Sequence, residues 1–209
     1  MPRQARLMLA EQPYHVTQRG VNKGAIFVDD IDRQLFLHLL HSAFLKHQVA
    51  LHAYVLMGNH VHLLATPSTR VGLANAMRMQ GNNYVQAFNQ RHQRSGPLWQ
   101  GRFHSSMVDS DAYLLSVYRY IELNPVRAGM VDHPARYRWS SYACNALGMR
   151  AGEVVPHATY IALGPDASAR QQRYVSFVES TMPEGQIGEI RRSLQRQRPL
   201  TKAKKGSES

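Results

Sequence analysis

The chain has 209 residues, of which 44% are hydrophobic and 9% aromatic. This composition supports a folded core and excludes a wholly disordered chain. Twenty-five Lys and Arg residues against 14 Asp and Glu residues give a formal net charge of +11. A surplus of this size favours a polyanionic partner such as nucleic acid, although the alternative is a charge that serves solubility alone.

Cysteine content and hydropathy exclude two further classes of protein. Cys144 is the single cysteine, so the chain forms neither an internal disulfide nor a cysteine-based zinc site. Residues 7–10 form an apolar run of only four residues, far shorter than a signal-peptide core, and no segment approaches the roughly 18 uninterrupted apolar residues of a membrane span. We therefore expect a cytoplasmic protein with no membrane partner.

The first part of the chain predicts one strand, one helix and a hairpin. Residues 14–19 alternate apolar and polar side chains, which is typical of a strand. Residues 30–47 carry apolar side chains at three- and four-residue spacings, as in an amphipathic helix. Residues 49–57 and 60–66 are β-rich runs separated by Gly58-Asn59, a pair suited to the positive φ angles of a tight hairpin.

A helix, a strand and another helix are predicted next. They cover about residues 71–92, 102–108 and 111–123, and Pro125 ends the last one. The order strand, helix, strand, strand, helix, strand, helix is the split βαβ pattern. We therefore expect an α+β fold, in which helices cover one face of an antiparallel sheet and the other face is free for a ligand.

The sequence changes character after residue 145, where glycines and prolines interrupt any long element. Residues 190–209 hold seven Lys and Arg residues and one Glu, a net charge of +6. We predict one domain over residues 1–145 and a basic C-terminal extension over 146–209, partly irregular or mobile, that binds DNA phosphates. The alternative is a solvated tail without a binding role. The basic residues concerned are Arg191, Arg192, Arg196, Arg198, Lys202, Lys204 and Lys205.

Two histidines form the sharpest local motif. His60 and His62 lie two residues apart in a predicted strand, so their side chains share one face. Two imidazoles that point the same way form half of a metal site. The ordinary alternative is a pair that is hydrogen-bonded or solvated.

The last predicted helix carries a candidate nucleophile. Tyr120 and Asn124 lie one turn apart on one face, while apolar residues on another face form the buried stripe, so Tyr120 would be presented outside the core. At neutral pH a tyrosine needs an electrophile polarised by a cation, and a phosphodiester bound to the metal of the two histidines would provide one. The ordinary alternatives are a tyrosine that caps the core and an asparagine that ends a helix.

Four motifs in order resemble those of the single-tyrosine HUH transposases, especially the REP-associated tyrosine transposases of bacteria. They are YVLMGNHVHLL at 54–64, LWQGRF at 98–103, YIELNPVRAGMV at 120–131 and WSSY at 139–142. The resemblance covers about residues 8–145. It implies a ferredoxin-like catalytic domain that cleaves and rejoins single-stranded DNA near palindromic hairpins, through a 5′-phosphotyrosine intermediate and with Mg²⁺ or Mn²⁺.

The same resemblance assigns roles to individual residues. It implies that His60 and His62 are metal ligands, that Tyr120 is the nucleophile, and that Asn124 is a candidate third ligand. We interpret Arg102, in the second motif, as a phosphate contact.

Two positions depart from the family pattern. Gly58 stands where many relatives have Pro, and Glu122 stands where many have His. Neither change affects the histidine pair or the tyrosine. Glu122 is either an additional ligand or a surface acid.

Two other functions stay open at this point. One is a metal-dependent nuclease that uses water, with Tyr120 as a bystander, and the other is a domesticated protein that binds palindromes without cutting them. The expected partner is single-stranded or hairpin DNA in each case. Some relatives insert the tyrosine helix of one subunit into the site of another and others act as monomers, so the resemblance is compatible with a monomer or a homodimer.

Overall fold

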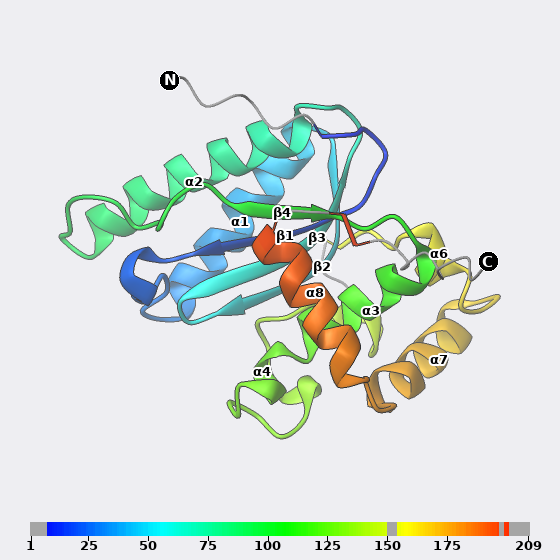
Figure 1. Cartoon of the computed structure of the whole chain (residues 1–209). Coiled ribbons are helices and arrows are strands. Elements are labelled where there is room, and N and C mark those ends of the chain that lie inside the picture. The colour runs from blue at the N-terminus through cyan, green and yellow to red at the C-terminus, as the bar shows by residue number, and fades with distance from the viewer. Residues whose placement is uncertain (1–7, 150–153, 197–198, 201–209) are drawn as a thin grey trace, which may run out of the picture.

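The computed structural model describes residues 8–149, 154–196 and 199–200. Its centre is a four-stranded antiparallel sheet with the strand order β2-β3-β1-β4 (Figure 1). The strands are β1 (Tyr14–Arg19), β2 (Val49–Met57), β3 (His60–Pro67) and β4 (His104–Met107). This order is the one expected of a split βαβ fold, so the predicted α+β class is confirmed.

The helices agree with the predicted succession of elements over the first 123 residues. They are α1 (Asp30–Lys46), α2 (Gly72–Arg91), α3 (Asp111–Glu122), α4 (Asn124–Arg127), α5 (Tyr142–Asn145), α6 (Ala158–Ile161), α7 (Ala167–Glu179) and α8 (Glu184–Arg196), with short 3₁₀ turns at Val21–Lys23 and Pro134–Arg136. None of the described helices is long and apolar enough to cross a membrane.

The sheet has apolar side chains on both faces. Val16, Leu63 and other buried side chains of one face pack in a single core with α1 and α2. Val55 and Leu64 belong to a second core that includes α3 and the C-terminal helices. In Figure 1, α8 crosses the sheet on the side away from α1 and α2. Part of the face that we expected to be free for a ligand is therefore covered.

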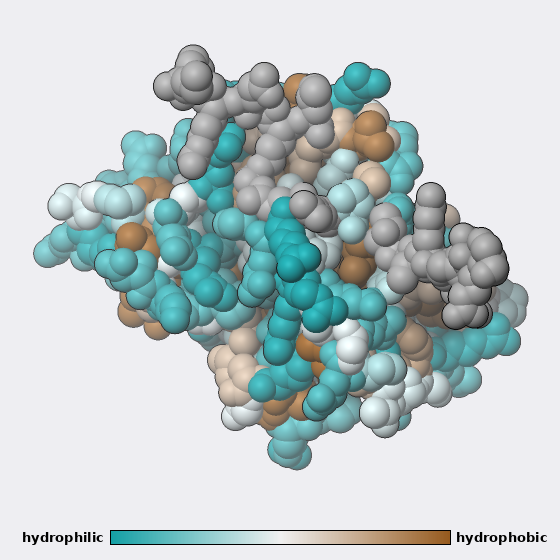
Figure 2. All heavy atoms as spheres, in the orientation of Figure 1, coloured by the Kyte–Doolittle hydropathy of each residue, from teal (hydrophilic) through white to brown (hydrophobic). Residues whose placement is uncertain are grey.

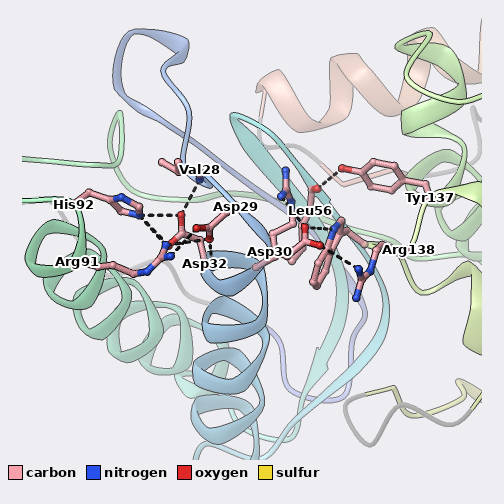
Figure 3. Close-up of polar contacts among 11 residues, drawn as sticks. Val28, Asp29, Asp30, Asp32, Leu56, Arg91, His92, Tyr137 and Arg138 are labelled. Carbon is pink, nitrogen blue, oxygen red and sulfur yellow. Dashed lines mark hydrogen bonds and ion pairs between the residues drawn. The ribbon is translucent and has the colours of Figure 1, made fainter.

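A polar cluster joins the start of α1 to the end of α2 (Figure 3). Asp29 caps α1 by accepting from the backbone N–H of Asp32. The fully buried Asp32 carboxylate accepts from the backbone N–H of Val28 at 2.7 Å and from Arg91 Nη1 at 2.6 Å, and it lies 3.0 Å from His92 Nε2. These bonds satisfy a buried charge and fix how the two helices lie together.

The WSSY motif borders the outer edge of the sheet. Leu56 of the edge strand β2 donates its N–H to the carbonyl of Trp139, and Ser141 donates to the carbonyl of Tyr54. The Trp139 indole also donates to Asp30 at 3.1 Å. This segment pairs with an edge that would otherwise expose unpaired backbone groups, so its role here is structural.

The β2–β3 turn differs in detail from the prediction. Gly58 and Asn59 form the turn, but neither has a positive φ. Both carbonyls are held by the loop after β1, since Gly20 donates to Asn59 and Ile26 donates to Gly58 at 2.9 Å each. These non-local bonds set the turn conformation. Gly20 is required there, because a Cβ would lie 2.3 Å from the carbonyl oxygen of Gly24.

The described part of residues 146–209 is more regular than the sequence indicates. It contains α6, α7 and α8, where a partly irregular or mobile extension was predicted. Gly164 and Pro165 lie between α6 and α7, so they separate helices instead of preventing them. Tyr174 and Ile190 bury apolar surface in the core that contains α3. The domain division at residue 145 stays a prediction.

Candidate active site

The two histidines of the motif point to one side of β3, as their spacing predicts. The ring centroids of His60 and His62 are 5.1 Å apart and the rings are nearly perpendicular, at 85°. On the neighbouring strand β1, Arg19 lies opposite His60 and Thr17 lies opposite His62. This part of the sheet is the floor of the candidate site.

Each of the two imidazoles uses its Nδ1 atom in a contact with a neighbouring side chain. His60 Nδ1 donates to Asn59 Oδ1 at 2.6 Å, since a carbonyl oxygen can only accept. His62 Nδ1 lies 3.0 Å from Nε2 of His15, a buried residue of β1. The Nε2 atom of each motif histidine is therefore the nitrogen left for a ligand.

Both motif histidines are neutral at physiological pH. Burial, with a smaller effect of Arg19, lowers the pKa of His60 to about 4. Burial, with the nearby His15 and His60, places the pKa of His62 well below its ordinary value. A neutral imidazole keeps the lone pair that binds a metal.

Tyr120 of α3 lies next to the histidines. Its ring centroid is 5.8 Å from that of His62 and 5.6 Å from that of His15, both in edge-on arrangements. Tyr120 is only 5% exposed, so the prediction that it is presented outside the core is wrong in this respect. The imidazoles of His15 and His62 and the Arg127 guanidinium contact its ring. Tyr120 therefore lines a pocket and does not face bulk water.

A pocket of about 490 Å³ brings these side chains together. It is lined by residues of β1, β3, β4, α3, α4 and α8, including His60, His62, Tyr120, Asn124 and Arg191. Segments far apart in sequence thus contribute an imidazole pair, a phenol, an amide and a cation to one cavity. That combination can bind a phosphate group and offer it a nucleophile.

Asn124 begins α4 and lies in the pocket wall. Its buried amide nitrogen has no hydrogen-bond partner among the described residues, so that part of the side chain is not engaged by the fold. Within the described ranges, no group of three or more His, Cys, Asp or Glu side chains is placed to hold a metal ion. Two neutral imidazoles nevertheless fit a divalent cation whose other ligands are water, substrate oxygens and the Asn124 amide oxygen, since an asparagine binds a metal through its oxygen and not through its nitrogen.

Glu122 is neither a ligand nor a surface acid. It is fully buried, and its carboxylate accepts from Ser141 at 2.5 Å, Asn145 at 2.8 Å and Tyr174 at 2.6 Å. Burial raises the pKa of Glu122 to about 7, although the three hydrogen bonds oppose that shift. The residue connects α3 to α5 and α7, away from the histidine pair.

Arg127 and His15 belong to the site although sequence reasoning assigned neither of them a role. The Arg127 guanidinium lies 4.3 Å from the centroid of the Tyr120 ring and donates to the Tyr120 carbonyl. Its Nε and Nη1 atoms are buried without partners in the described chain, and burial lowers its pKa to about 10. Arg127 lies in the third motif and His15 lies in the first predicted strand. Neither the motif nor the strand pattern indicates which side chains these two residues contact.

The predicted DNA-binding residues are not all in one place. Arg102 borders a different pocket, with Trp99 and Gly81, and is not part of the site. Arg191 lines the site, whereas Arg192 and Arg196 are exposed on α8. Figure 2 shows a largely hydrophilic surface on this side of the molecule. The other four, Arg198, Lys202, Lys204 and Lys205, lie outside the described residues.

Comparisons with known proteins identify the family of the chain. The family model described as "Transposase IS200 like" matches residues 9–124, a range that contains the histidine pair, Tyr120 and Asn124. The chain is similar to the solved structure of a REP-associated tyrosine transposase bound to a REP hairpin, with a TM-score of 0.61 and 18% identity over 76% of this chain and 96% of that one. At this identity the similarity shows a shared fold.

A second solved structure is more distant. It is described as a putative transposase from Deinococcus radiodurans R1, with a TM-score of 0.39 and 21% identity over 57% of this chain and 95% of that one. A similarity this low carries no argument about the fold. No curated protein sequence matches the chain.

Proposed function

The chain belongs to the family of IS200-like transposases, and from this membership we propose that it cleaves and rejoins single-stranded DNA near a hairpin, using Tyr120 as the nucleophile. The observation that carries the proposal is the distance of 5.8 Å between the ring centroids of Tyr120 and His62, in a pocket that both line. The hairpin is proposed because the similar solved structure holds one.

The proposed reaction exchanges one phosphoester for another. The Tyr120 oxygen attacks the scissile phosphorus and loses its proton to water, while the bond from phosphorus to the 3′ oxygen breaks. The leaving 3′ oxygen takes up a proton, and the DNA stays attached as a 5′-phosphotyrosine. Because the two esters have similar energy, a different 3′-hydroxyl can reverse the step, so the same site would cut and join.

The residues of the pocket divide the remaining tasks. A divalent cation, Mg²⁺ or Mn²⁺, held by His60, His62 and Asn124, would when bound polarise the phosphate and stabilise its developing charge. Arg191 would attract the DNA backbone to the mouth of the pocket. An unpaired strand suits this recessed site, because its phosphate can enter the pocket without a second strand.

We also propose that one chain holds a complete site. The imidazole pair and the phenol are in contact within the same chain, at centroid distances of 5.8 Å or less. No second subunit is needed to supply Tyr120. Of the two oligomeric states expected from the resemblance, this arrangement favours a monomer that acts alone.

The test is a covalent-adduct assay. The full chain is incubated with Mn²⁺ and a labelled hairpin oligonucleotide that has single-stranded flanks, and the products are separated under denaturing conditions. We expect a protein–DNA adduct that Tyr120→Phe abolishes while changing DNA affinity by no more than about twofold, since one hydroxyl is lost. Tyr118→Phe is the matched control on the same helix, because Tyr118 is fully buried in the second core.

Other outcomes would overturn the proposal in distinguishable ways. Cleavage without an adduct, unaffected by Tyr120→Phe, would indicate a nuclease that uses water. Tight binding of hairpin DNA without metal-dependent cleavage of any substrate would indicate a domesticated binding protein.

A further inference from the structure

His15 is a buried histidine whose ring contacts both the candidate metal ligand and the candidate nucleophile. It is 1% exposed and lies in β1, two residues before Thr17, which is opposite His62 in the sheet. Its Nε2 atom is 3.0 Å from Nδ1 of His62. Its ring centroid is 5.6 Å from that of Tyr120.

The contact between the two imidazoles has two possible hydrogen-bond directions with opposite consequences. A neutral imidazole carries one N–H and one lone pair, so one of the two facing nitrogens must hold the hydrogen. If His15 Nε2 donated, His62 would carry its own hydrogen on Nε2, and that atom could not bind a cation. If His62 Nδ1 donates, the lone pair of its Nε2 is free.

We propose that His15 is a positioning residue, an inference that rests on the proposed function. His15 accepts the Nδ1–H of His62 and thereby keeps the Nε2 lone pair of His62 available to the divalent cation. A histidine that binds a metal generally donates its other N–H to an acceptor that fixes the tautomer and the ring orientation. His15 is the side chain that the described structure places at that nitrogen.

The other motif histidine supports this hydrogen-bond direction. His60 Nδ1 donates to Asn59 Oδ1 at 2.6 Å, which leaves Nε2 of His60 as the ligand atom. With His15 as the acceptor for His62, both histidines present the same nitrogen. His60 then donates to the Asn59 amide oxygen at the tip of the hairpin, and His62 donates to the His15 imidazole inside the sheet.

The contact with Tyr120 gives His15 a second positioning effect. Its ring meets the phenol ring at 69°, and the His62 ring meets the phenol ring at 85°. A buried imidazole at this position therefore holds the ligand and the nucleophile at a fixed separation. A smaller residue would leave a cavity between them.

The first measurement is the Mn²⁺ affinity of the full chain without DNA. Titration calorimetry or the electron paramagnetic resonance signal of free Mn²⁺ gives this affinity. We expect His15→Phe, which keeps the ring but removes the acceptor, to weaken Mn²⁺ binding about 10- to 100-fold. His15→Gln should recover most of the affinity, because its amide oxygen can accept the same hydrogen bond.

His52→Phe is the matched control. His52 is also a buried strand histidine, 3% exposed, and both of its ring nitrogens are hydrogen-bonded, to Val155 and Thr66. It does not line the site, so His52→Phe should bind Mn²⁺ within about twofold of the wild type. A His15→Phe variant with the same unchanged affinity would overturn the inference.

The second measurement uses the wild type alone, so it does not depend on whether a variant folds. Long-range ¹H–¹⁵N correlation of the metal-free protein identifies which nitrogen of each histidine carries hydrogen. We expect the hydrogen of His62 on Nδ1, and finding it on Nε2 would overturn the inference. If the wild type forms the Tyr120 adduct but fails these tests, the inference alone is overturned; a wild type that binds no Mn²⁺ overturns the proposed metal ligands as well.

Discussion

Tyr120 is held by contacts on three sides of its ring. His15 and His62 meet it edge-on, and Arg127 stacks on it at 4.3 Å. The Arg127 guanidinium also donates to the Tyr120 carbonyl, so one side chain holds both the ring and the backbone of this residue. The orientation of the proposed nucleophile therefore depends on the Arg127 guanidinium as well as on the imidazoles of His15 and His62.

Arg127→Ala should slow adduct formation without abolishing it. The variant loses a cation–π contact and a hydrogen bond, each worth about 1–2 kcal/mol when partly buried, so the free energy of unfolding should fall by about 1–3 kcal/mol. Urea denaturation and the rate of adduct formation measure the two effects.

Arg138→Ala controls for the loss of a stacked arginine away from the site. Arg138 lies 4.7 Å from the Trp139 ring centroid and pairs with Asp30. Its removal should leave the adduct rate unchanged. An Arg127→Ala variant with the wild-type rate would contradict a positioning role.

At the scale of elements, α8 combines an apolar side and a basic side. Its Ile190 and Leu194 are buried, whereas Arg192 and Arg196 are exposed. The apolar side explains why a segment predicted to be partly irregular or mobile is a packed helix, since burial of that stripe stabilises it. The basic side lies on the surface of the helix whose Arg191 lines the pocket.

We expect the double variant Arg192→Ala/Arg196→Ala to bind hairpin DNA more weakly and with a smaller salt dependence. Each arginine that neutralises a phosphate releases about one counterion, so the slope of log affinity against log salt should decrease by about 2. Fluorescence anisotropy over a range of NaCl concentrations measures this slope. Arg136→Ala, which removes an exposed arginine paired with Asp132, should leave it unchanged. An unchanged slope in the double variant would remove α8 from the DNA-binding surface.

Across the molecule, the sheet separates a structural side from the side that carries the candidate active site. The core with α1 and α2 is tied by the buried Asp32 cluster. The opposite side carries the imidazole pair, to which α3, α4 and α8 add the phenol, the amide and the cation. All of these groups come from one chain.

A mixing experiment tests whether one chain suffices. Tyr120→Phe keeps the imidazole pair and His62→Ala keeps the phenol, so a site shared between chains would be restored when the two variants are mixed. We expect no adduct from the mixture in the denaturing assay, at concentrations where the wild type reacts fully. Recovery of a substantial fraction of the wild-type adduct would show that subunits exchange the tyrosine helix.

The buried histidines should make the fold less stable in mild acid. Burial lowers the pKa of His15 to about 3 and the pKa values of His52 and His60 to about 4. Below the ordinary histidine pKa of about 6.5, the unfolded chain binds protons that the folded chain excludes, so the free energy of unfolding falls as the pH decreases from 7 towards 4. Glu122, whose pKa is raised to about 7, acts in the opposite direction, but as a single group.

Urea denaturation at pH 7.5, 6 and 5 and constant ionic strength measures this pH dependence. His52→Gln should reduce it, because the variant lacks one buried histidine whose pKa is lowered in the folded chain. A free energy of unfolding that stays constant or rises between pH 7.5 and 5 would contradict the prediction.

Local sequence determined the parts of this protein that depend on near neighbours along the chain. The spacing of apolar residues predicted α1 and α3 to within one or two residues, and the two-residue step placed His60 and His62 on one face. Asn124, one turn after Tyr120, was likewise expected near the tyrosine and lines the same pocket. These predictions succeed because helix and strand periodicities are local properties of the backbone.

Contacts between distant segments depend on how the chain packs, and local sequence patterns do not predict them. His15 contacts His62, which lies 47 positions away in the sequence. Glu122 is a buried structural acid because it accepts hydrogen bonds from Ser141 and Tyr174, which lie 19 and 52 positions away. A strand pattern shows which face a side chain takes, but the partner opposite it depends on strand order and register. The contact of His62 with His15, the burial of Tyr120 and the position of α8 over the candidate-site side of the sheet therefore follow from how the elements pack and not from any one of them.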